Sequence, residues 1–228
     1  MKFHEIEYKR PDIKELENKF NDFLSIFDSA ENFEVQDAVM KDINNLRMEL
    51  QTLGTIANIK YSIDTFNKSY EEEQNFFDKN YPVYEGLVAK YYNSIINSRF
   101  RKKLEEKWGK QLFDFAEQIV KTHRPEILED LKYENKLKTD YMKLLASAKI
   151  IFEDKERNLS DMVPFMESAD RHTRKNAAEA KWNFFSENAA EFDRIFDELV
   201  KVRHRMAKKL GYENFVEMGY ARMGRTDY

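Results

Sequence analysis

Apolar side chains recur every three or four residues along most of the chain, which is the spacing of an amphipathic α-helix. The first run consists of Ile13, Leu16, Phe20, Leu24 and Phe27. It follows Arg10-Pro11-Asp12, and we expect Pro11 in the first turn, where its missing N–H costs no hydrogen bond. A second run extends from Val35 to Tyr61, and Gly54 within it indicates close packing against another helix.

A third periodic run extends from Ser69 to Leu104 and predicts another long helix. Ser69 followed by Glu72 matches a capping box, so we expect the helix to begin at Ser69. Pro82 lies inside the run and predicts a kink or a break. Gly109 then separates this helix from a shorter apolar run, Leu112–Val120.

The segment Ser147–Met162 does not continue the helical spacing of the residues around it. Pro125 starts a helix that reaches Leu145, and three β-forming residues, Ile150-Ile151-Phe152, then follow. The polar stretch 153–156 could turn the chain. We therefore predict a short β-hairpin at residues 148–159.

Helical signals return after the hairpin. Ser160 is expected to cap a brief helix ahead of Pro164, and two longer helices are predicted at 169–187 and 189–210. The second ends on two lysines and a glycine, Lys208-Lys209-Leu210-Gly211, which is typical of a helix C-terminus. Asn214 is expected to cap a last helix that ends near Met223.

These patterns predict a mainly α fold, a multi-helical lobe with one short β-hairpin. The chain has 228 residues but only 6 Gly and 4 Pro, fewer than an all-β domain would need for its turns. The hairpin region is the expected internal boundary. It divides the chain into an N-terminal helical lobe, residues 1–146, and a second part, residues 147–228, packed on the first.

Charge and cysteine content exclude several function classes. The chain has 38 Lys and Arg against 42 Asp and Glu, so it lacks the positive excess expected of a protein that binds nucleic acid. It has no cysteine, which excludes disulfides, thiol nucleophiles and thiolate metal sites. The N-terminus lacks a signal-peptide core, and no apolar run approaches the length of a membrane span. The expected location is the cytoplasm, with neither nucleic acid nor membrane as a partner.

The histidines offer little for catalysis. The stretch His4–Tyr8, "HEIEY", begins like H-E-x-x-H, but Tyr8 stands where the second zinc ligand belongs. His123, His172 and His204 are far apart in the sequence and do not have the spacing of metal ligands. A site formed by side chains from distant helices remains an alternative. We therefore predict no catalytic, cofactor-binding or metal-ligating residue in this chain.

Charged and aromatic clusters have mostly structural interpretations. The acidic residues Glu71–Glu73 and those in Glu126–Glu134 are expected on solvated helix faces. The basic segment Arg99–Lys110 could bind an anion, but pairing with Glu105 and Glu106 favours an exposed, salt-bridged helix. The chain is also rich in aromatic residues, with 18 Phe and 12 Tyr. Most should lie in the core, and the remainder should line a groove or meet a partner. Those at helical spacing include Tyr91, Tyr92, Trp182, Phe184, Phe185, Phe192 and Phe196.

Longer motifs resemble one family. The second half contains "RHTRKNAAEA" and, from Arg203 to Tyr220, "RHRMAKKLGYENFVEMGY", followed by "RMGRTDY". The first half contains "YKRPDI", "INNLRMELQTLGTIANIKYSIDT" and "NFFDKNYPVYEGL". Together these segments resemble the oligoendopeptidase F family, zinc metallopeptidases related to thimet oligopeptidase. The resemblance extends over essentially the whole chain.

The resemblance implies a helical N-terminal lobe that forms one wall and the roof of a deep channel. In that channel, short peptides would be hydrolysed by a zinc-activated water, with the Glu of H-E-x-x-H as general base. Family members are longer, and their zinc ligands lie downstream of the motif that ends this chain. No position in residues 1–228 matches those ligands, so no catalytic residue is carried over. Residues 147–228 would then hold the hairpin and the start of the helical peptidase region.

Three interpretations remain open. The first is the N-terminal portion of a zinc oligoendopeptidase, inactive alone, with zinc expected only in the full-length enzyme. Its partners would be short peptides and the missing C-terminal catalytic lobe, and exposed apolar surface would allow self-association. The second is a stand-alone helical module, derived from the same family, that binds peptides or proteins. The third is an enzyme whose site the sequence does not reveal.

Overall fold

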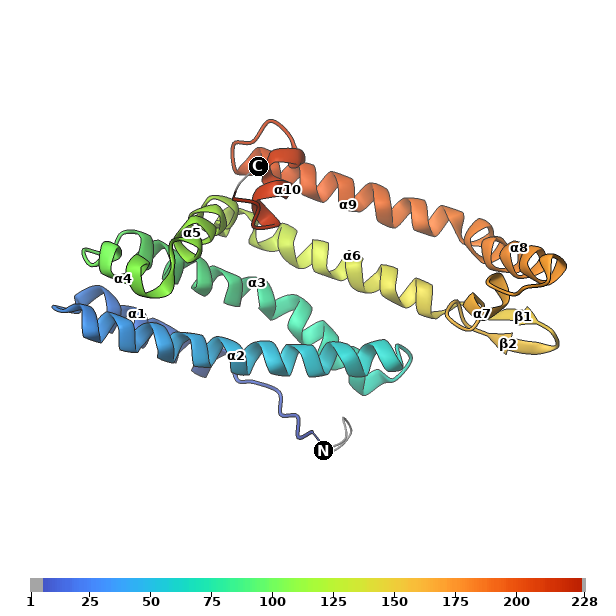
Figure 1. Cartoon of the computed structure of the whole chain (residues 1–228), viewed down its shortest axis with the longest axis horizontal. Helices are drawn as coiled ribbons and strands as arrows, with labels where there is room; N and C mark the ends of the chain where they lie inside the picture. Colours follow the sequence, from blue (N-terminus) through green and yellow to red (C-terminus); the bar gives the residue numbers. More distant parts are fainter. Residues whose placement is uncertain (1–5, 227–228) are drawn as a thin grey trace. The chain divides into compact units, whose positions relative to one another are not determined.

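The regular structure of the chain is almost entirely helical (Figure 1). The computed structural model describes residues 6–226. Its elements in chain order are α1 Ile13–Ser29, α2 Phe33–Ile63, α3 Lys68–Ile96, α4 Arg101–Trp108, α5 Lys110–Thr122, a 3₁₀ turn Pro125–Ile127, α6 Leu128–Ala146, β1 Ile150–Phe152, β2 Lys155–Arg157, α7 Val163–Met166, α8 Arg171–Glu187, α9 Ala189–Lys209 and α10 Phe215–Arg222. The predicted fold class, mainly α with one hairpin, is confirmed.

The chain forms two compact units, each with its own buried cluster. The first unit comprises the chain up to Lys132 together with the segment from Arg203 onward, and the second comprises Tyr133–Val202. The division into residues 1–146 and 147–228 that the sequence suggests stays a prediction.

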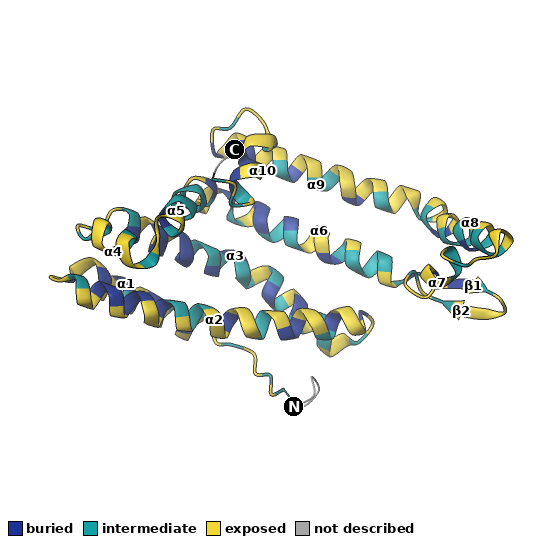
Figure 2. Cartoon of the chain, in the orientation of Figure 1, coloured by how far each residue is buried: buried dark blue, intermediate teal, exposed yellow. Residues whose placement is uncertain are grey.

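The core of the first unit surrounds α3, which packs against α1, α2 and α5. Figure 2 shows α1 and α2 with one buried and one exposed face, as their apolar spacing predicts. The side chains at the centre are fully buried and mostly aromatic or aliphatic. They include Phe20, Phe27, Met40, Ile43, Tyr91, Ile95, Leu104 and Phe113. A smaller cluster in the same unit joins the start of α6 to the end of α9 and to α10.

The boundaries of α3 differ from the sequence prediction. The Asn67 side chain accepts hydrogen bonds from the N–H groups of Ser69 and Tyr70, so the helix begins at Lys68 and Ser69 already lies in its first turn. The predicted capping box is therefore wrong. The helix continues through Pro82 without a break and ends at Ile96 instead of Leu104, and the next residues belong to a separate helix, α4.

For the other helix ends, some predictions are confirmed and others are wrong. Pro11 lies before α1, because Asp12 is the N-cap and accepts from the N–H groups of the first turn. Ser160 contributes no side-chain cap to α7. Gly109 and Gly211 have φ angles of +88° and +87° and end their helices as expected. Asn214 caps α10 by accepting from the Val216 N–H at 2.8 Å.

Glycines on α2 and α3 permit close approaches. A Cβ added to Gly54 would lie 3.3 Å from the Phe77 ring, which confirms that α2 packs tightly against α3 at this point. A Cβ on Gly86 would lie 3.3 Å from Nε2 of His123, at the end of α5. The ring of His123 is therefore held against the α3 backbone.

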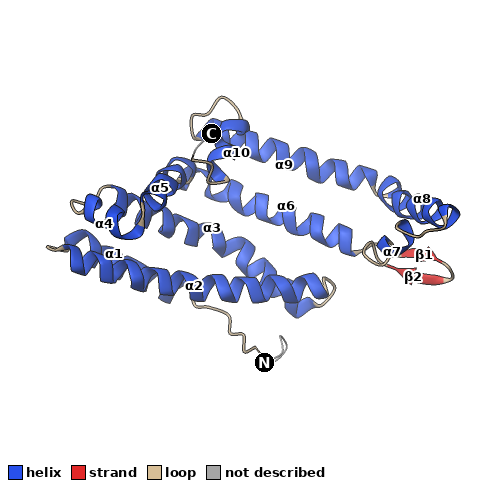
Figure 3. Ribbon diagram, in the orientation of Figure 1, coloured by secondary structure: helices blue, strands red, loops and turns tan. Residues whose placement is uncertain are grey.

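The second unit contains the predicted hairpin (Figure 3). Strands β1 and β2 pair antiparallel, with Phe152 opposite Lys155. Glu153 and Asp154 have φ angles of +50° and +59°, which are typical of a two-residue type I′ turn. The turn is thus shorter than the four residues predicted, because Lys155 and Glu156 already belong to β2. A small core joins the hairpin to α8; its buried members are Ala148, Ile150, Met162, Ala177 and Phe184.

A buried carboxylate links α2 to α4. Asp37 lies on α2 with its side chain only 8% exposed, and it accepts from Nζ of Lys107 at 2.7 Å and from Nε1 of Trp108 at 3.0 Å. Lys41, one turn further along α2, also pairs with it at 2.8 Å. Burial alone would raise the pKa of Asp37, but hydrogen bonds from Lys107, Lys41 and Trp108 outweigh it and lower the pKa to about 2.

Replacing this carboxylate should destabilise the fold in a pH-dependent way. Because the folded-state pKa of Asp37 lies below its ordinary value of 3.8, its contribution is complete above about pH 4 and is lost as the pH falls toward 2. Asp37→Asn should lower the free energy of unfolding at pH 7 by about 1–2 kcal/mol, and the difference should shrink below pH 4. Urea denaturation at pH 7, 4 and 3 measures this. Asp42→Asn, exposed on the same helix, is the control and should have no comparable effect.

His123 should make the stability of the fold depend on pH in a second, separate range. Burial, and secondarily the positive charge of Arg222, lower the pKa of His123 from 6.5 to about 4. Between these values the unfolded chain binds more protons, so stability falls as the pH drops from about 6.5 to 4. His123→Gln should remove about 1–3 kcal/mol of that pH-dependent loss in urea denaturation. The exposed His172→Gln is the control, and equal pH slopes for wild type and His123→Gln would contradict this role.

Candidate functional site

The stretch His4–Tyr8 begins like a zinc motif, and the part of it that the structure describes has a structural role. His4 and Glu5 lie outside the described residues. Tyr8 donates a hydrogen bond to the carboxylate of Glu73 on α3, and Arg10 pairs with the same carboxylate at 2.8 Å. Burial and the Glu73 carboxylate raise the pKa of Tyr8, so its hydroxyl remains a donor. These contacts attach the segment before α1 to α3.

The remaining histidines do not converge. His172 and His204 are exposed, and His172 lies 3.1 Å from the amide of Asn176 on its own helix. His123 is half-buried against α3. Within residues 6–226, no three side chains among His, Asp and Glu are grouped so that they could hold a metal ion.

Two of the acidic residues that were expected on a solvated face are buried instead. Asp130 accepts from Nε of Arg205 and from Nζ of Lys209, both at 2.7 Å, and so links the start of α6 to the end of α9. Burial acts to raise the pKa of Asp130, but the hydrogen bonds from the two cations outweigh it and lower the pKa. Glu134, one turn further on, is also buried. For Asp130 the prediction fails because its cationic partners, Arg205 and Lys209, lie more than seventy residues away in the sequence.

The basic segment forms ion pairs, as the sequence predicts. Arg101 on α4 pairs with Glu105 at 2.6 Å and with Glu117 of α5 at 2.9 Å. Lys107 is held by Asp37. Arg101 and Lys107 are thus engaged within the fold, which favours a salt-bridged helix over an anion-binding one.

A pocket of about 270 Å³ opens in the first unit between α2, α3 and α5. Polar and aromatic groups form part of its wall, and aliphatic groups form the rest. Its lining residues are Arg47, Gln51, Tyr81, Tyr84, Glu85, Val88, Tyr92, Phe115, Ile119, Thr122, His123, Leu131 and Arg222. We call it the Arg47 pocket.

Arg47 is the most unusual of these side chains. Its Nη2 donates to the Tyr92 hydroxyl at 2.9 Å and its Nη1 to the Asn44 amide oxygen at 3.1 Å. The guanidinium also lies over the Tyr92 ring, 5.2 Å from its centre. Its Nε is buried without a hydrogen-bond partner, and none of the ion pairs among the described residues includes Arg47. Burial disfavours its charge, but the Tyr92 and Tyr84 hydroxyls outweigh burial and raise the pKa of Arg47.

The Tyr84 hydroxyl beside Arg47 remains neutral. Burial raises the pKa of Tyr84, against the opposing charge of Arg47. The Tyr84 hydroxyl is buried and makes no hydrogen bond of acceptable geometry, although it lies beside the guanidinium. Nε of Arg47 and the hydroxyl of Tyr84 are therefore both shielded from solvent and without a hydrogen-bond partner of acceptable geometry.

Sequence reasoning did not select Arg47. A signal was nevertheless present, because Arg47 follows Ile43 by four residues and precedes Leu50 by three. It thus occupies the apolar face of α2, where an arginine is rarely buried without a partner. Of the aromatic residues, Tyr91, Tyr92 and Phe184 are buried, as expected for core.

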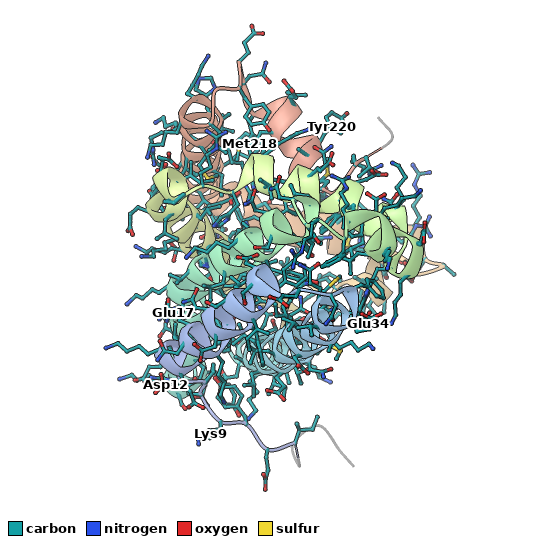
Figure 4. The ribbon with its side chains drawn as sticks, turned by 90° about the vertical axis from the view of Figure 1, so that its left-hand side faces the viewer. Lys9, Asp12, Glu17, Glu34, Met218 and Tyr220 are labelled. Carbon is teal, nitrogen blue, oxygen red and sulfur yellow. The ribbon has the colours of Figure 1, made fainter. Side chains whose placement is uncertain are left out.

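Other aromatic and aliphatic side chains near the end of the chain are exposed. Trp182 on α8 is 58% exposed and Phe196 on α9 is 70% exposed. On α10, Figure 4 shows Met218 on the side of α9 and Tyr220 on another face. Val216 on α10 and Met223, the residue that directly follows this helix, are 66% and 60% exposed. None of the helices in the described part of the chain combines the length and the apolar character that a membrane crossing requires.

Solved structures of high similarity cover the whole chain. PZ peptidase A, solved with an inhibitor, is 52% identical with a TM-score of 0.96, and this chain covers 40% of it. A structure described as an oligoendopeptidase F is 50% identical with a TM-score of 0.97, again with 40% covered. Another, from Bacillus anthracis str. Ames, is 51% identical with a TM-score of 0.96 and 42% covered. This chain thus spans about two fifths of the length of these relatives.

A family model and the solved structures relate the chain to the same group of peptidases. No curated protein matches the chain. The family model described as the Peptidase M3 N-terminal domain matches residues 3–123, slightly more than half of the chain. Together with about 50% identity to oligoendopeptidase F structures over its full length, this match shows that the chain belongs to the M3 peptidase family and corresponds to the N-terminal part of an oligoendopeptidase.

Proposed function

We propose that this chain forms the N-terminal, channel-wall portion of a zinc-dependent oligoendopeptidase that hydrolyses short peptides, and that it is inactive alone. The observation that carries the proposal is its match, over its entire length, to two fifths of proteins described as peptidases. The wall would admit short unfolded peptides and exclude folded proteins. The expected location is the cytoplasm.

The catalytic zinc belongs to the other part of the proposed enzyme. The described residues bring no set of zinc ligands together, and no H-E-x-x-H occurs in the sequence. Within the chain, we propose residues 1–146 as the N-terminal lobe and residues 147–228 as the start of the helical peptidase region. The end of the family match at residue 123 supports a boundary in this part of the chain.

In this proposal, the C-terminal catalytic lobe covers the exposed apolar side chains near the C-terminal end of the chain. Val216 on α10 and Met223 at its C-terminal end form an apolar stripe, and the opposite face of α10 is already packed through Met218. The relatives contain a further three fifths of polypeptide that this chain does not. Side chains of this size are seldom left exposed together unless another surface covers them. Without the lobe, the same stripe would promote self-association.

Reconstitution tests the proposal directly. The chain is mixed with the part of PZ peptidase A beyond its match to this chain, expressed separately, and cleavage of an internally quenched peptide is followed. We expect turnover only when both polypeptides are present, and its loss when a zinc chelator is added. Turnover by residues 1–228 alone, or a stable complex without turnover, would contradict the proposal.

Substitutions on α10 test the docking surface in the same assay. Val216→Asp combined with Met223→Asp should weaken complex formation at least about tenfold, because each places a charge in an apolar contact. Met48→Asp on α2, where the methionine is 57% exposed, is the matched control and should bind normally. Equal binding by the α10 variant and the control would argue against this surface.

A further inference from the structure

A row of apolar side chains on α9 is largely exposed. Phe192, Phe196 and Val200 lie four residues apart, so their side chains are neighbours along one face of the helix. Phe192 is half-buried, whereas Phe196 is 70% exposed and Val200 is 50% exposed. We call these three residues the α9 ridge. Over eight residues the ridge extends about 12 Å, which is about two turns of helix.

Aromatic rings on α8 continue the ridge. The centre of the Phe185 ring lies 5.2 Å from that of Phe192, and the centre of the Trp182 ring lies 5.3 Å from that of Phe185. Trp182, at the end of this series of rings, is 58% exposed. The rings and the ridge all belong to the second unit. Single exposed apolar side chains are common, but apolar surface that continues from one helix to the next usually marks an interaction surface.

Most of the charged side chains on this part of α9 are paired with one another. Glu191 pairs with Arg194 at 2.7 Å, and Asp197 pairs with Lys201 at 2.6 Å. Among the described residues, Asp193 is the one charge between Glu191 and Lys201 that has no ion pair. Exposed pairs of this kind cancel most of the local charge. Apolar contact is therefore the main attraction that this face offers to a partner.

The spacing of the ridge indicates a helix as the partner. Side chains at positions i, i+4 and i+8 form the ridges by which one α-helix packs into the grooves of another. Peptides and small ligands, by contrast, are usually bound in concave pockets. A row of side chains that stands out from a helix is convex, so a second helix with an apolar face fits it better.

We propose that the α9 ridge and Trp182 bind the apolar face of a helix from the C-terminal catalytic lobe. The ridge lies beyond the match to the N-terminal domain model, which ends at residue 123, and the relatives contain a further three fifths of polypeptide that this chain does not. The choice of this lobe as the source rests on the proposed function; the choice of a helix rests on the ridge alone. The apolar stripe at α10 belongs to the first unit, so the lobe would contact each of the two units.

The chain has no cysteine, so a single introduced cysteine is the one thiol in it that a maleimide can label. Phe196→Cys and Val200→Cys are each mixed with the part of PZ peptidase A beyond its match to this chain, and labelling is followed through the mass of the 228-residue polypeptide. Labelling of both variants should slow at least about tenfold in the complex, because a packed helix opens only rarely to the reagent. Arg194→Cys is the matched control. Arg194 is exposed about 160° around α9 from Phe196, so its rate should not change.

The outcomes separate this surface from the proposed function. If Phe196→Cys and Val200→Cys are labelled in the mixture as fast as in the free chain, the proposal is overturned, and peptide hydrolysis by the same mixture would show that the function nevertheless holds. Slower labelling without zinc-dependent hydrolysis would support the contact and count against the function. Labelling that slows when this chain alone is concentrated, or when a short peptide is added to it, would identify a different occupant and contradict the proposal.

Discussion

The burial of α3 among α1, α2 and α5 is the constraint on which the first unit depends. A helix enclosed by three others must present large side chains on most of its faces, and α3 does so largely with aromatic rings. Tyrosine fills such space but brings a hydroxyl into the interior, where it needs a hydrogen-bond partner. Tyr92 obtains one from Arg47, whereas Tyr84 does not. The polar pocket beside α3 is thus a direct consequence of the way this core is packed.

Carboxylates at the edges of this core join helices that are distant in sequence. Asp37 links α2 to α4 through Lys107 and the Trp108 N–H, and Asp130 links α6 to α9 through Arg205 and Lys209. Such pairs stabilise only when every buried charge is compensated, which is why their pKa values lie below normal. The apolar stripe at α10 has no comparable partner within the described residues, and that contrast supports the proposal that a C-terminal lobe covers it.

Local features were predictable from the sequence and long-range ones were not. Apolar spacing located the long helices, and Gly109, Gly211 and Asn214 marked helix ends, because these signals involve only neighbouring residues. The start of α3 was misjudged because Asn67 and Ser69 are both good caps two positions apart. The burial of Asp130 could not be derived, since its partners are set by packing between helices. The relationship to peptidases was indicated by the longer sequence motifs. Apolar spacing alone predicts helices but does not identify a family.

The central claim is that this polypeptide supplies a wall of an oligoendopeptidase while its zinc ligands lie elsewhere. The most direct measurement is the zinc content of the purified 228-residue chain, by mass spectrometry after equilibration with excess zinc and removal of free metal. It is compared with that of an intact relative, such as PZ peptidase A, treated identically. The account predicts stoichiometric zinc in the relative and none retained by this chain. One zinc ion retained per 228-residue chain would contradict it.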